Sequence, residues 1–148
     1  MTNYKTFYGF SKEPFSQDIK TDELYQTTSL KAFTERFLYA VNIGAVSVAT
    51  GDVGSGKSTA LRYASEKLHP SMYRVIPVIA NTGSVIEILR QMCIALDVEC
   101  RSHSIATLIK TIRNILIEIT QRKQTAVMII DEAQLMRLEV FAEIHTIG

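Results

Sequence analysis

The chain has 148 residues, which is enough for one domain with a buried core. Hydrophobic residues make up 47% and charged residues 21%, as in ordinary folded domains. The net charge is +1 and the basic residues are scattered, so the composition gives no strong field for nucleic acid or an anionic membrane. No apolar run approaches the roughly twenty residues of a membrane span, and the N-terminus lacks a signal-peptide layout. We therefore expect a cytoplasmic protein with no membrane contact.

Two cysteines, Cys93 and Cys100, suit a reducing compartment. With His103 they form the spacing C-x6-C-x2-H, which is not a usual zinc spacing. Cys93 also falls on the apolar stripe of a predicted helix. We expect structural cysteines rather than metal ligands.

The first half of the chain begins with an aromatic, turn-rich stretch that has no clear period. A helix with one apolar face follows and stops near Gly44, and the uncharged run AVSVAT then predicts a buried strand that ends at Gly51. The expected elements are an N-terminal arm over 1–28, a helix over 29–43, a strand over 45–50 and a helix over 57–68.

The second half alternates strands and helices. Pro77 favours a sheet edge for its strand, because proline lacks a backbone donor. Ser84 and Ser104 are candidate caps of two helices with apolar stripes, and the last strand is continuously apolar, as if buried on both sides. The expected elements are strands over 73–80 and 125–130, helices over 84–96 and 104–119, and a helix over 137–145. This order predicts an α/β fold with a parallel sheet. The family resemblance described below implies that 73–80 lies beside 125–130 in that sheet.

Residues 51–58 read GDVGSGKS and match the phosphate-loop (Walker A) pattern G-x-x-x-x-G-K-[ST]. Glycines allow the backbone to wrap a phosphate, and a helix N-terminus supplies unpaired N–H groups. Lys57 would contact the β- and γ-phosphates and Ser58 would bind Mg²⁺. We expect ATP or ADP to contact Gly51, Asp52, Val53, Gly54, Ser55, Gly56, Lys57, Ser58 and Thr59.

The sequence VMIIDEAQ places Asp131 and Glu132 after an apolar strand, where open parallel sheets bind ligands (Walker B). Asp131 is the candidate second Mg²⁺ ligand, and Glu132 is the candidate base for the attacking water. Together with Lys57 as a catalytic cation, this pair favours ATP hydrolysis.

These motifs, with YGFSKEPFS at the start, SVIEILRQMCIALDV and VMIIDEAQLM, resemble AAA+ ATPases of the ExeA, or general secretion pathway protein A, type. This family includes transposase-associated members that resemble the TniB and IstB classes. The stretch RLEVFAEIHTI is more similar to these transposon-linked members than to the secretion proteins. The resemblance implies a three-layer P-loop fold over 29–148 and a motor or switch subunit in transposition or type II secretion. It also implies that adenine contacts the Phe10-to-Phe15 region or Tyr25, although these aromatics could simply pack the arm.

Members of that family carry further strands, an arginine finger and a helical lid after the acidic strand. We expect these to be missing here, so that the fold is incomplete at its C-terminal side, turnover is weak, and the open sheet self-associates. Two alternatives remain: a nucleotide-sensing interaction module without significant turnover, and a helicase fragment, since DEAQ resembles a helicase motif. DNA with a transposase, or secretion machinery, are the possible partners.

Overall fold

The computed structural model describes residues 4–13, 16, 19–80, 84–99, 102–145 and 147. Cys100, Phe15 and residues 81–83 lie outside these residues. The chain divides into two compact units, residues 1–64 and 65–148, and each is described by itself. The sequence-based division at residue 28 stays a prediction.

The first unit is helical. Its main helix, α2 (Thr28–Asn42), ends one residue before position 43, the last residue of the expected helix. The buried face of α2 includes Phe37 and Ala40. Thr27 caps α2, because its hydroxyl accepts a hydrogen bond from the Leu30 N–H at 3.1 Å, and Gly44 follows the helix with a φ of +64°. The elements are α1 (Tyr4–Tyr8), the 3-10 turn η1 (Thr21–Glu23), α2 (Thr28–Asn42) and α3 (Lys57–Ser65), whose last residue begins the second unit.

The expected strand over 45–50 is wrong for this structure. These residues form neither helix nor strand, and Val46 and Val48 are 97% and 83% exposed. The apolar pattern is that of a strand, but a strand also needs a neighbour that accepts and donates its backbone hydrogen bonds. No described strand pairs with this segment.

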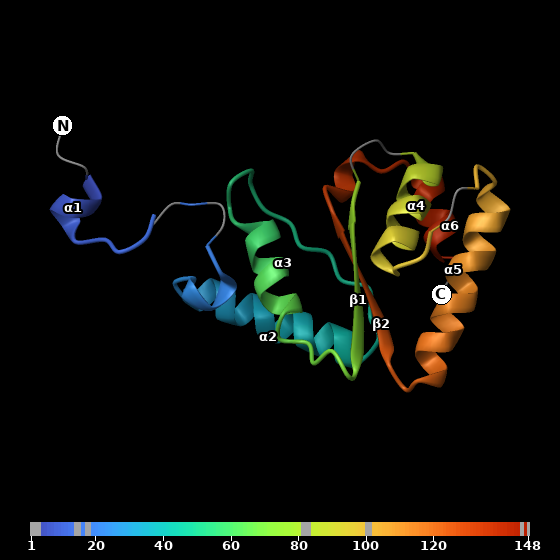
Figure 1. Ribbon diagram of the computed structural model, residues 1–148, viewed down its shortest axis with the longest axis horizontal. Helices are drawn as coiled ribbons and strands as arrows, with labels where there is room; N and C mark the ends of the chain where they lie inside the picture. The colour runs from blue at the N-terminus through green and yellow to red at the C-terminus, as the bar shows by residue number, and fades with distance from the viewer. Residues whose placement is uncertain are drawn as a thin grey trace. The chain divides into compact units, whose positions relative to one another are not determined.

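The second unit contains a two-stranded parallel sheet (Figure 1). Strands β1 (Tyr73–Ile79) and β2 (Thr125–Asp131) pair in a register that runs from Tyr73 opposite Thr125 to Ile79 opposite Asp131. This confirms the predicted adjacency and direction of the two strands, and Pro77 lies on an edge strand. Around the sheet are α4 (Val85–Ala95), α5 (Ile105–Gln121), the 3-10 turn η2 (Ala133–Leu135) and α6 (Leu138–His145).

Helices α4 and α5 pack against the sheet and against each other, and their apolar stripes form the core as predicted. Ser84 and Ser104 are the N-caps, but their side chains make no capping hydrogen bond. Instead, their carbonyl oxygens accept the first helical hydrogen bonds, from the N–H groups of Ile88 and Leu108.

Burial of the last strand on both sides is not observed. No residue of β2 is fully buried, and its first two residues are exposed. On β1, Ile76 and Val78 are buried under the helices, whereas Pro77 and Ile79 on the other face are exposed. The second unit by itself therefore has two layers, one sheet and one set of helices, and a third layer stays a prediction.

Candidate functional site

The glycine-rich loop between Gly51 and Lys57 has the backbone conformation that its glycines predict. Gly54 and Gly56 have φ angles of +79° and +87°, in the region that side chains disfavour. At Gly51, a Cβ atom would lie 3.0 Å from Ser55 Oγ, so the loop closes tightly there. The Ser55 N–H donates to the Asp52 carbonyl at 3.2 Å, which makes the first turn of the loop.

Helix α3 begins at the end of this loop. Its first helical hydrogen bond runs from the Ala60 N–H to the Gly56 carbonyl at 2.8 Å. The N–H groups just before Ala60 therefore have no intrahelical acceptor, and the helix dipole adds partial positive charge at this end. Ser58 and Thr59 are exposed, as a residue that contacts a ligand from solvent must be. The loop can bind an anion.

Lys57 lies across the loop. Its ammonium Nζ donates to the carbonyl oxygens of Gly51 at 2.9 Å and Asp52 at 2.8 Å. Both partners are neutral acceptors, so they orient the ammonium without cancelling its charge. A lysine held at a glycine loop that leads into a helix N-terminus fits a di- or triphosphate, which carries dense negative charge.

The acidic pair lies in the second unit, at the carboxyl end of β2. Asp131 is the last residue of the strand, and its carbonyl accepts a hydrogen bond from the Ala80 N–H at 3.0 Å. Its side chain is half-buried, and Oδ1 accepts from the Glu132 N–H at 2.9 Å. The first contact holds the Asp131 backbone at the end of the sheet, and the second orients its carboxylate, which could serve as a cation ligand.

Glu132 adopts left-handed backbone geometry, with φ 57° and ψ 32°. This conformation turns the chain sharply out of the strand, and its exposed carboxylate accepts a hydrogen bond from the Gln134 side-chain amide. Gln134 was not assigned a role from the sequence, although it is the last letter of the DEAQ motif. Gln134 orients the candidate base, so the DEAQ motif already contained the residue that positions Glu132.

The predicted site residues thus fall into two groups, the loop with its lysine in the first unit and the acidic pair in the second. A magnesium site with Ser58 and Asp131 as ligands stays a prediction. Within the described ranges, no three His, Cys, Asp or Glu side chains are grouped as a metal site.

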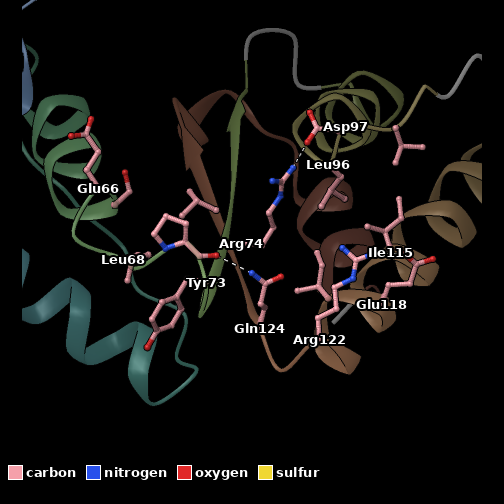
Figure 2. Close-up of a pocket in the computed structure, with 15 residues that line it drawn as sticks. Glu66, Leu68, Tyr73, Arg74, Leu96, Asp97, Ile115, Glu118, Arg122 and Gln124 are labelled. Atoms are coloured by element: carbon pink, nitrogen blue, oxygen red, sulfur yellow. Dashed lines mark hydrogen bonds and ion pairs between the residues drawn. The ribbon is translucent and has the colours of Figure 1, made fainter.

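A separate cavity of about 870 Å³ lies at the opposite, amino end of the two strands (Figure 2). Tyr73, Arg74 and Gln124 line it, whereas Asp131 lies at the carboxyl end. Arg74 points toward Asp97, with which it forms an ion pair, and it also donates to the Ala95 carbonyl at 3.1 Å. Arg122 also lines the cavity and lies 3.9 Å from the Glu118 carboxylate, so both arginines of this cavity have an acidic neighbour.

The loop, the helix that follows it and the acidic strand end define the P-loop class of nucleotide-binding α/β proteins. A family model described as an AAA domain matches residues 44–148, and the chain belongs to this family. It is therefore of the nucleotide-binding ATPase type. No curated protein and no solved structure matches the chain. None of the helices in the described ranges is long and apolar enough to cross a membrane.

Proposed function

We propose that the chain binds ATP and ADP with Mg²⁺ through residues 51–59 and works as an ATP-dependent switch or motor subunit. The observation that carries this proposal is the position of Lys57, held over the glycine loop by two neutral carbonyls. Ser58 and Asp131 are the proposed Mg²⁺ ligands, and Glu132 is the proposed base that activates water. Gln134 is a positioning residue, since it contacts Glu132.

A thermal unfolding experiment tests nucleotide binding. A ligand at a hundred times its dissociation constant adds about 2.7 kcal/mol to the free energy of unfolding. For a protein of this size, that corresponds to a rise in Tm of roughly 5–10 °C. We expect Mg-ADP to produce this rise in the wild-type chain, and Lys57→Ala to remove most of it because the ammonium no longer contacts phosphate.

Lys31→Ala is the matched control, because Lys31 is an exposed lysine of helix α2 outside the loop. It should keep the full ligand-induced shift. A wild-type melting curve that millimolar Mg-ADP and Mg-ATP leave unmoved would show that the chain does not bind nucleotide. An equal shift in Tm for Lys57→Ala would show that the nucleotide binds outside the loop.

For the biological process, we propose a transposase-associated ATPase rather than a secretion component. The basis is the stretch RLEVFAEIHTI, residues 137–147, whose sequence resembles the transposon-linked members of the family named in the sequence analysis. An ATP-dependent affinity for DNA that falls steeply with salt would support this assignment. Equal DNA affinity with and without ATP would count against it. A nucleotide-sensing module without turnover is the second candidate, and the hydrolysis assay argued below separates the two.

A further inference from the structure

The carboxyl end of the sheet is held by hydrogen bonds that follow one another from helix α4 to the acidic pair. The side-chain oxygen of Gln91 on α4 accepts a hydrogen bond from the Ile79 N–H at 2.8 Å. The next residue, Ala80, donates its N–H to the Asp131 carbonyl at 3.0 Å. Asp131 Oδ1 then accepts from the Glu132 N–H at 2.9 Å. All of these residues belong to the second unit, so the connection lies within one compact body.

The Ile79 N–H is the last donor of β1 that points away from β2. Because the Ala80 N–H faces β2, the alternation of the strand turns the N–H of Ile79 to the outer edge. The preceding outward residue is Pro77, which has no N–H to donate. The bond to Gln91 therefore ties helix α4 to the end of this edge strand.

Gln91 differs from its neighbours on α4. Ile88, Leu89 and Met92 are buried in the core, whereas Gln91 is half-buried at the border of the packed face. An apolar side chain could fill this border position as well, but it could not accept a hydrogen bond from the Ile79 N–H. The structure thus uses the amide oxygen of this side chain and not only its bulk.

We propose that Gln91 is a positioning residue for Asp131: its bond to Ile79 keeps the last rung of the sheet closed, and the Asp131 carboxylate stays where it can bind Mg²⁺. The last rung is the hydrogen bond from Ala80 to Asp131. Ends of secondary structure open locally at low cost, and a tie beside the rung opposes that opening. Removing a group that orients a metal ligand lowers metal affinity. The role toward Mg²⁺ rests on the proposed function, whereas the role at the strand end rests on the hydrogen bonds alone.

Three variants separate this role from general stability. Gln91→Met keeps the length and helix propensity of glutamine but lacks the amide oxygen. Gln91→Glu is the rescue variant, because a carboxylate oxygen can accept the same hydrogen bond. Gln124→Met is the matched control: Gln124 is also half-buried, and its side-chain amide bonds a backbone group at the same distance, the Pro70 carbonyl at 2.8 Å. It precedes β2, roughly 20 Å along the strand from Asp131.

Amide hydrogen exchange on the 148-residue chain without nucleotide tests the strand end. We expect exchange at the Ala80 amide to be about tenfold faster in Gln91→Met than in the wild type, because the last rung opens more often. Gln91→Glu and Gln124→Met should exchange at the wild-type rate at this amide. Equal exchange at Ala80 in Gln91→Met and the wild type would overturn the proposal, since the rung would then stay closed without Gln91.

Calorimetric titration of the same proteins with ADP, in excess Mg²⁺ and again in EDTA, tests the metal site. We expect Gln91→Met to bind Mg-ADP about three- to tenfold more weakly and to bind ADP in EDTA as the wild type does, because the glycine loop is unchanged. Gln91→Glu should restore the Mg-ADP affinity, and Gln124→Met should keep it.

An equal loss of affinity with and without Mg²⁺ in Gln91→Met, or the same Mg²⁺-dependent loss in Gln124→Met, would overturn the proposal because either result assigns a general structural role. A wild type that binds no ADP, or binds it independently of Mg²⁺, contradicts the proposed function and with it the role toward Mg²⁺. Exchange at Ala80 still decides the role of Gln91 at the strand end in that case.

Discussion

Glu132 has a backbone conformation that its side chain does not favour. A non-glycine residue in the left-handed region costs roughly 1–2 kcal/mol, and such residues cluster at functional sites. Asp97 and Lys123 share this conformation, with φ angles of 59° and 58° against 57° for Glu132. Both of those follow helix ends, where a left-handed residue is a common cap. Glu132 instead follows a strand, so helix capping does not explain it.

We therefore expect Glu132→Gly and Lys123→Gly each to raise the free energy of unfolding, by about 1 kcal/mol. For a protein of this size, the rise in Tm would be about 2–4 °C. Thermal unfolding of the two variants beside the wild type measures this. If Glu132→Gly lowers Tm while Lys123→Gly raises it, the contact between Glu132 and Gln134 is worth more than the strain, and Glu132 has a mainly structural role.

At the scale of elements, α5 shows how closely an apolar stripe predicts burial. Ile112 lies on the stripe and is 0% exposed, whereas Ile117 lies off it and is 56% exposed. We expect Ile112→Ala to lower the free energy of unfolding by about 2–5 kcal/mol, because it leaves a cavity in the core. Ile117→Ala should stay within about 0.5 kcal/mol of the wild type. Denaturant unfolding measures both, and equal losses would contradict this packing of α5.

The helices could be predicted because each depends on local periodicity. The β1–β2 pair joins residues far apart in the chain, such as Tyr73 and Thr125, and its adjacency was predicted from the family resemblance. The loop conformation could also be predicted, because Gly54 and Gly56 adopt positive φ angles that other residues disfavour. The segment 45–50 could not be placed from sequence, because a strand forms only with a partner strand, and partner identity is not written in the segment itself. The left-handed turn at Glu132 was missed for a similar reason, since glutamate carries no preference for that conformation.

For the whole molecule, fast hydrolysis would require a second cation beside Lys57 at the transferred phosphoryl group. Lys57 is the cation held at the loop, while Arg62 on the same helix donates a hydrogen bond to the Ile19 carbonyl at 3.2 Å. Transfer of the γ-phosphoryl group spreads charge over three oxygens, and a second cation at that point is worth about 10³–10⁵ in rate. Arg137 follows the acidic pair in the sequence. It comes just before α6 and only six positions after the end of β2.

We therefore expect the 148-residue chain to bind Mg-ATP but to turn it over near the background rate, and Glu132→Gln to change that rate little. The expected rate deficit corresponds to roughly 4–7 kcal/mol of transition-state stabilisation, at 1.36 kcal/mol per tenfold. Steady-state phosphate release from wild type, Glu132→Gln and Lys57→Ala measures this, with Lys31→Ala as the control for the lysine change. Strong turnover that Glu132→Gln abolishes would mean that the chain assembles a complete catalytic site. In that case, turnover that rises more than linearly with protein concentration would point to a site completed by a second copy.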